Sequence, residues 1–237
     1  MRMNKTPVLL KALAACSVLS MCWVSQSMAT PSDAVLISFE GPWALSTPSE
    51  TLKTIDGKPL PLLPDAKKIY EQNQALKKQG KDSFDPLSKC LPAGMTRLYN
   101  EGAPFRMAIG DRFAGMFFQT QHLFRIITMY KGHFEAIAPA YMGQAVGTWD
   151  GNTLVVDTDN FNDMTLLDDA GLPHSDELHM VERISVPADG KLHIEMTLTD
   201  PKTFSKPVKT EFVFDKKPGQ QFTEDYCLQR KGLRTSN

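Results

Sequence analysis

The feature of this sequence that most limits its possible folds is a series of short extended segments that begins at Phe105. The segments are rich in β-branched and aromatic residues, and turn-forming residues separate them. Residues 192–199 alternate strictly between apolar and polar side chains, which is typical of a strand with one buried and one solvated face. The turns Asp150-Gly151-Asn152 and Ala188-Asp189-Gly190 each join two segments as expected for a hairpin.

Because the expected strands follow one another along the chain, we predict an all-β fold, an antiparallel meander of eight to ten strands that closes into a lipocalin-like barrel. The expected strands are residues 35–39 with Gly41-Pro42-Trp43, then 105–109, 115–120, 123–130, 145–149, 153–158, 178–186, 192–199, 208–215 and 222–228. A helix is expected from Pro64 to Gly80, since proline suits a first helical turn and glycine ends a helix.

The N-terminus has the pattern of a secretory signal peptide. Three basic residues precede the apolar run of residues 12–24, which is too short to span a bilayer, and Ser27-Met28-Ala29 matches a cleavage site. We therefore expect residues 1–29 to be removed and residues 30–237 to form one barrel-like domain in the periplasm or outside the cell, with an N-terminal extension and helix over about 30–84. The alternative is a lipoprotein processed at Cys16, with the box Leu13-Ala14-Ala15-Cys16.

The charge of the chain limits its possible partners, and its cysteines predict a disulfide. Without the leader the chain keeps 23 basic against 27 acidic residues, so a nucleic-acid partner is not expected. No other run is apolar enough to cross a membrane, and the oligomeric state is left open. Cys90 and Cys227 remain after cleavage, and in an oxidising compartment a disulfide between them is the expected state, with free thiols as the alternative.

Several motifs between residues 85 and 228 resemble an uncharacterised family of secreted bacterial proteins. They include Cys90-Leu91-Pro92-Ala93-Gly94, the run of residues 147–158 (GTWDGNTLVVDT), and residues 173–183 (PHSDELHMVER). The resemblance implies a secreted protein but no reaction. A weaker resemblance, to lipocalin-type barrels, comes from Gly41-Pro42-Trp43. Where relatives in the first family resemble G-x-S-x-G, this chain has Ala145, which excludes a serine nucleophile there.

The strongest catalytic candidates lie in the polar segment that leads into the strand of residues 178–186. His174 follows a proline in a turn, His179 begins the strand, and an imidazole is the usual proton carrier near neutral pH. Glu182 shares a strand face with apolar residues, so burial could raise its pKa for general acid–base chemistry. The alternative is that Glu182 forms a structural ion pair with an interior arginine such as Arg125.

Other polar side chains complete the expected site. Arg125 or Arg183 would hold an oxyanion or a substrate carboxylate, and Asp157 is a catalytic base or the start of a polar loop. The residues assigned to substrate binding are Trp149, Tyr141, Ser175, His122 and Phe118.

A metal site is a further alternative, although no cofactor is expected. His174, His179 and one of the acids Asp163, Asp168 or Asp169 could form a His₂–carboxylate set, but the H-x₄-H spacing matches no standard zinc pattern.

These patterns lead to three hypotheses. The first is a secreted enzyme that binds a small molecule in a barrel cavity and acts by cofactor-independent acid–base chemistry, as a lyase, dehydratase or isomerase. The second is a lipocalin-like carrier of a small hydrophobic ligand without catalysis. The third is a structural envelope protein. The first requires His174, His179 and Glu182 to converge on one enclosed pocket.

Overall fold

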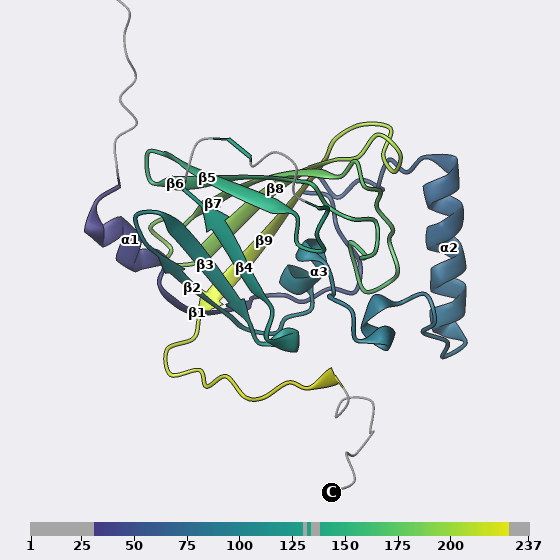
Figure 1. The fold of residues 1–237 in the computed structure, drawn as a ribbon, viewed down its shortest axis with the longest axis horizontal. Coiled ribbons are helices and arrows are strands. Elements are labelled where there is room, and N and C mark those ends of the chain that lie inside the picture. The colour runs from purple at the N-terminus through teal and green to yellow at the C-terminus, as the bar shows by residue number, and fades with distance from the viewer. Residues whose placement is uncertain (1–30, 130–131, 134–137, 228–237) are drawn as a thin grey trace, which may run out of the picture.

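Nine strands form a closed barrel in the computed structural model, which describes residues 31–129, 132–133 and 138–227. The fold class predicted from the sequence is confirmed (Figure 1). The strands are β1 (Gly41–Leu45), β2 (Phe105–Ile109), β3 (Phe113–Phe118), β4 (Phe124–Thr128), β5 (Gln144–Asp150), β6 (Thr153–Asp159), β7 (His179–Ser185), β8 (Leu192–Thr199) and β9 (Val208–Lys216).

Neighbouring strands pair in sequence order, and β1 closes the barrel by pairing with both β2 and β9. One pair departs from the expected antiparallel meander, since β4 and β5 run parallel, with Ile127 opposite Ala145. Parallel neighbours need a connection that carries the chain back to the starting end of the first strand. The chain between Thr128 and Gln144, part of which lies outside the described residues, makes this connection.

In the described ranges, three α-helices and two 3₁₀ turns lie outside the sheet. They are α1 (Asp33–Phe39), α2 (Pro64–Lys78), η1 (Pro86–Lys89), α3 (Met95–Asn100) and η2 (Thr120–His122). Figure 1 shows α1 and α3 near opposite ends of the strands, with α2 farther out beyond α3. The predicted helix that begins at Pro64 is confirmed and ends at Lys78, just before Gly80, whose φ is +71°. No helix in the described ranges has both the length and the apolarity needed to cross a membrane.

Two predicted strands differ from the structure. In the first, residues 41–43 lie in β1 as expected, but residues 35–39 do not form a strand. Residues 35–39 are helical, because the segment turns Phe39 into the protein, where its carbonyl accepts a hydrogen bond of 2.8 Å from the Trp43 indole. Tertiary packing of this kind overrides the β propensity of Val, Ile and Phe. Residues 222–226 carry no strand pairing, and Leu228 lies outside the described residues.

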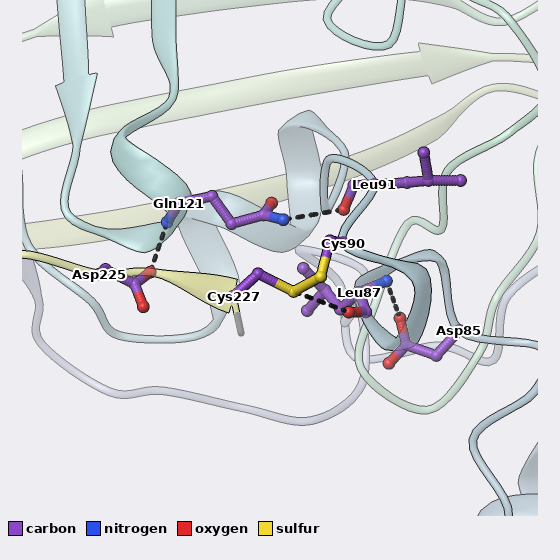
Figure 2. Close-up of a disulfide and its surroundings, with 7 residues drawn as sticks. All are labelled: Asp85, Leu87, Cys90, Leu91, Gln121, Asp225 and Cys227. Atoms are coloured by element: carbon purple, nitrogen blue, oxygen red, sulfur yellow. Dashed lines mark hydrogen bonds between the residues drawn. A yellow bond between two sulfur atoms is a disulfide. The ribbon is translucent and has the colours of Figure 1, made fainter. Parts of the chain in front are cut away.

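The C-terminal segment after β9 passes along the outside of the barrel (Figure 1). It is tied to η1 by the Cys90–Cys227 disulfide, so the pairing predicted from the sequence is confirmed. Figure 2 shows a second attachment, in which the Gln121 backbone amide donates to Asp225 at 2.5 Å. We call residues 217–227 the C-terminal strap.

The barrel interior is filled with large side chains. Tyr99 of α3 lies among four phenylalanine rings, with ring centroids 5.6–6.1 Å from its own. These rings belong to Phe105, Phe118, Phe212 and Phe214. All five are buried in one continuous core with Trp43 and Met116. A barrel of this size can be filled by its own side chains, and here a helix adds to the filling.

Candidate functional site

The barrel interior holds a buried polar cluster formed by four side chains. Arg125 of β4 and Glu182 of β7 form a two-point ion pair, with Nη1 3.0 Å from Oε1 and Nη2 contacting Oε2. The Tyr99 hydroxyl donates to Glu182 Oε1 at 2.8 Å, and Arg125 Nη2 donates to Thr158 Oγ1 at 2.8 Å. The structural alternative, in which Arg125 pairs with Glu182, is therefore confirmed.

Burial sets the protonation of this cluster. The side chains of Arg125 and Glu182 are 1% and 0% exposed. Burial by itself would lower the pKa of Arg125, but the adjacent carboxylate outweighs it and the pKa lies above its ordinary value. Burial also raises the pKa of Tyr99 well above its ordinary value, and Glu182 adds to the effect. The cluster thus places a charged arginine and a neutral tyrosine beside the Glu182 carboxyl group, and all four side chains are buried.

His174 is held inside the long loop between β6 and β7. Its Nδ1 lies 2.9 Å from the Ser175 carbonyl oxygen, so this nitrogen carries the proton. Its Nε2 then accepts from Thr165 Oγ1 at 2.7 Å. Burial lowers the pKa of His174, so the imidazole is neutral at neutral pH. Both nitrogens are satisfied within the loop, which makes His174 an internal anchor of this segment.

His179 lies on the outer face of the barrel wall. Its Nε2 is 2.9 Å from Asp157 Oδ1 on the neighbouring strand β6, and both side chains are nearly half exposed. His133 contacts the same Asp157 oxygen through Nε2 at 3.1 Å and lies 2.9 Å from Asp159 Oδ1 through Nδ1. We call these four residues the His133–His179 cluster. It brings together two residues predicted to be catalytic, His179 and Asp157.

The three groups on which the enzyme hypothesis depended do not converge. His179 and Glu182 are three residues apart on β7, and side chains of a strand alternate between its faces, so the barrel wall separates them. His174 lies in the loop before β7 and bonds only to loop residues. Arg183, on the outer face, pairs with Asp150 at 2.8 Å. The cavity predicted to hold all three groups is therefore not formed by these residues.

Two of the three acids considered for a metal site, Asp168 and Asp169, have other partners. Asp168 is buried and accepts hydrogen bonds from three backbone amides and from the Tyr70 hydroxyl. Asp169 pairs with Arg97 at 2.5 Å. Among the residues that the structure describes, no group of three or more His, Cys, Asp or Glu side chains is arranged to hold a metal ion. The alternative metal-binding set of His174, His179 and an acid is not brought together among these residues.

The residues assigned to substrate binding are dispersed over the molecule. Trp149 packs edge-on against Phe39 at one end of the barrel, and Phe118 is buried in the core. His122 stacks on Phe117 beside the C-terminal strap. The Ser175 backbone amide and hydroxyl both donate to Asp200, and Tyr141 lies partly buried in the turn before β5. These residues do not line a common pocket.

Sequence reasoning missed α3 and its two functionally placed side chains. Tyr99 completes the interior cluster, and Arg97 forms a bidentate pair with Asp85 at 2.7 and 2.8 Å. Two opposing carboxylates raise the pKa of Arg97 against the lowering effect of burial. The signal available in the sequence was Arg97, the one charged residue in the stretch of residues 95–100. This signal indicates a buried charge only when the acidic partners of the arginine are known.

A groove of about 1120 Å³ lies on the outer face of β2, β3 and β4. We call it the β2–β4 groove. Its apolar side chains are unusually exposed for their size, at 49% for Phe113, 57% for Phe124 and 53% for Ile126. Ile37 of α1, 63% exposed, borders it. A contiguous exposed apolar surface of this kind commonly marks a binding site.

Glycine shapes the floor of this groove. A Cβ atom at Gly115 would lie 2.9 Å from the Phe124 ring, so the ring can lie against the sheet only because residue 115 has no side chain. Close backbone approach is a common reason for a glycine inside a strand. The result is a shallow apolar floor at β3, with Phe124 on one side.

Two cations and one acid line the opposite edge of the β2–β4 groove. Lys216 ends β9 and Arg106 lies on β2, and only β1 separates these strands. Glu40 lines the same edge. The guanidinium of Arg106 lies over the Phe222 ring of the C-terminal strap, with its carbon 5.5 Å from the ring centre. The groove thus has a polar side and an apolar side.

Comparison with known proteins adds no assignment to this geometry. No protein-family model matches the chain, and no curated protein shows significant similarity to it.

Proposed function

We propose that this protein binds a small amphipathic molecule in the β2–β4 groove, as a carrier and not as an enzyme. The observation that carries the proposal is the gathering of Phe113, Phe124 and Ile126, each about half exposed, around one groove on the barrel wall. Burial of apolar surface is the main source of affinity for such ligands, at roughly 25 cal/mol per Å². The proposal keeps the carrier hypothesis but moves the ligand from the interior to the outer face.

The size of the groove suits a single small ligand. Ligand sites in proteins commonly measure roughly 300–1,000 Å³, and the groove, at about 1120 Å³, is open on one side. By contrast, the interior space expected of a lipocalin-type carrier is taken up here by Tyr99 and the phenylalanine rings around it. The outer groove is therefore the better candidate for the binding site.

The test is the binding of a neutral fluorescent apolar probe, N-phenyl-1-naphthylamine, to the mature protein. We expect saturable binding that Ile126→Glu weakens at least about tenfold, because a charge on the groove floor opposes burial of an apolar ring. Ile69→Glu on α2 is the matched control, since Ile69 is 45% exposed and lies outside the groove. Equal affinity of wild type and Ile126→Glu would refute the proposal.

One observation favours a second candidate, acid–base catalysis at the His133–His179 cluster. The Asp157 carboxylate lies within hydrogen-bond distance of His179, which is the arrangement that orients an imidazole as a general base. Mature protein would be screened against pools of small organic acids and sugars for product formation by mass spectrometry. His179→Gln should abolish any turnover found, whereas His193→Gln, a surface histidine paired with Asp189 and Glu211, should not.

A further inference from the structure

The cationic and the large apolar side chains of the β2–β4 groove lie on different strands. Strands follow the order β9, β1, β2, β3 and β4 around this part of the barrel. The cations Lys216 and Arg106 come from β9 and β2, whereas Phe113, Phe124 and Ile126 come from β3 and β4. One side of the groove is therefore basic, and the other is apolar.

The two cations are held in position by aromatic rings. Lys216 Nζ lies 5.2 Å from the centre of the Trp43 ring and donates to the Ser38 carbonyl oxygen at 3.2 Å. Arg106 is held over the ring of Phe222. Within the described part of the chain, neither cation forms an ion pair with a carboxylate, although Glu40 lines the same edge of the groove. Carboxylates in solution are natural partners for such groups.

The C-terminal strap fixes one of the cations. Phe222 packs on Phe117, with ring centroids 5.6 Å apart, and so presents its face to Arg106. The next residue is anchored by Gln119, whose amide donates to the Thr223 carbonyl at 2.7 Å. The strap thereby holds the guanidinium at the groove and reduces the side-chain entropy lost on binding an anion.

From this geometry we infer that the ligand of the β2–β4 groove is an anionic single-chain amphiphile, whose carboxylate lies at Arg106 and Lys216 and whose hydrocarbon chain crosses β3 and β4. The inference rests on the proposed function, and it adds the chemical class of the ligand. A long-chain carboxylate satisfies both sides of the groove, whereas a neutral apolar molecule leaves the basic side without a partner.

The experiment compares dodecanoate with its methyl ester, which has the same chain and no charge, by displacement of N-phenyl-1-naphthylamine at low salt and below the micelle concentration. We expect dodecanoate to bind about five- to tenfold more tightly than the ester, with the preference falling as salt increases. The double variant Arg106→Gln/Lys216→Gln should lose the preference and keep the affinity for the ester. Lys209→Gln, an exposed lysine of β9 outside the groove, is the control.

Each outcome has a distinct meaning. Equal binding of acid and ester by the wild type overturns the inference and leaves the carrier proposal standing, whereas binding of neither ligand nor probe overturns both. Sedimentation with phosphatidylglycerol vesicles forms a separate arm. Binding to vesicles without binding of monomeric dodecanoate would assign the groove to a membrane surface and overturn the inference. A wild-type dimer that dissociates in Ile126→Glu would assign the groove to a second copy of the chain and would also overturn it.

Discussion

At the scale of single residues, several polar side chains in and around the loop between β6 and β7, among them His174, act as internal anchors. Asp200 accepts five hydrogen bonds, from backbone and hydroxyl groups of Ser175 and Thr203 and from the Lys202 amide. His174 and Asp168 are saturated in the same way by loop groups. A buried polar group without a partner costs roughly 1–3 kcal/mol, so a long loop packed on a barrel needs such anchors.

The Arg125–Glu182 pair allows a direct test of this structural role. Arg125→Met leaves a buried carboxylate unpaired and should lower the free energy of unfolding by about 3–5 kcal/mol. The double variant Arg125→Met/Glu182→Leu should be more stable than Arg125→Met, because no charge is left unpaired. Urea denaturation of wild type, Arg125→Met, Glu182→Leu and the double variant measures the coupling free energy between the two side chains. Losses that simply add would show that the two groups act independently.

His174 predicts a component of acid sensitivity. Burial lowers its folded-state pKa below that of the unfolded chain, so the unfolded state takes up the proton first as the pH falls below about 6.5. Stability from this residue is complete above that pH and is lost as the pH falls towards the folded pKa. Wild type should therefore lose more stability than His174→Gln between pH 7.5 and pH 5.5, as measured by urea denaturation. The hydrogen bond to Glu211 raises the pKa of His193, so His193 changes the pH dependence of stability in the opposite direction. This contribution is the same in wild type and in His174→Gln. An identical pH dependence in the two proteins would contradict the assignment.

At the scale of elements, short segments outside the sheet complete the barrel. Helix α1 places Phe39 against Trp43 and Trp149, and α3 inserts Tyr99 into the core. The C-terminal strap adds no strand, but it joins η1, η2 and the edge of the β2–β4 groove. These elements are short, so their structure depends on contacts with the barrel and not on their own propensity.

The disulfide should stabilise the molecule without determining its fold. Cys90 and Cys227 are 137 residues apart in sequence, and closing a loop of this length contributes about 4–5 kcal/mol in the chain-entropy model. The variant Cys90→Ser/Cys227→Ser should keep the wild-type far-ultraviolet circular dichroism, because every pairing of the barrel lies outside the strap. Its urea midpoint should fall markedly. A midpoint equal to that of the oxidised wild type would contradict this expectation.

At the scale of the whole molecule, closure of the barrel leaves the outer wall as the available binding surface. In the part of the chain that the structure describes, the strands pair in an unbroken ring, so no sheet edge there is open for strand addition. The inner face is occupied by aromatic side chains and the Arg125–Glu182 pair. The outer face carries both the β2–β4 groove and the His133–His179 cluster, on different parts of the wall.

Ligand binding in the groove should stabilise the whole barrel. At a free ligand concentration of one hundred times Kd, a site that exists only in the folded state adds about 2.7 kcal/mol. Differential scanning fluorimetry with dodecanoate should show a concentration-dependent rise in Tm for wild type and for Ile69→Glu. Under the same conditions Ile126→Glu should show a much smaller rise. A comparable rise in Ile126→Glu would place the ligand elsewhere.

How much could be read from the sequence differs between fold and site. Alternating segments such as residues 192–199 predict strands because the side-chain period of two is local and strong. The helices α1 and α3 were missed, because their helical state depends on the barrel against which Phe39 and Tyr99 pack. The parallel pairing of β4 and β5 depends on the path of a long connection, which local patterns do not reveal.

By itself the sequence determined the strands from β2 to β9, the helix that begins at Pro64 and the disulfide, since each follows from local periodicity, turn chemistry or the few cysteines available. It also separated His179 from Glu182, because alternate side chains of a strand point in opposite directions. Only the tertiary structure decided which face each occupies and what each contacts. Closure of the barrel brought Arg125 to Glu182 and set Phe113, Phe124 and Ile126 on one wall, because these contacts join strands that are distant along the chain.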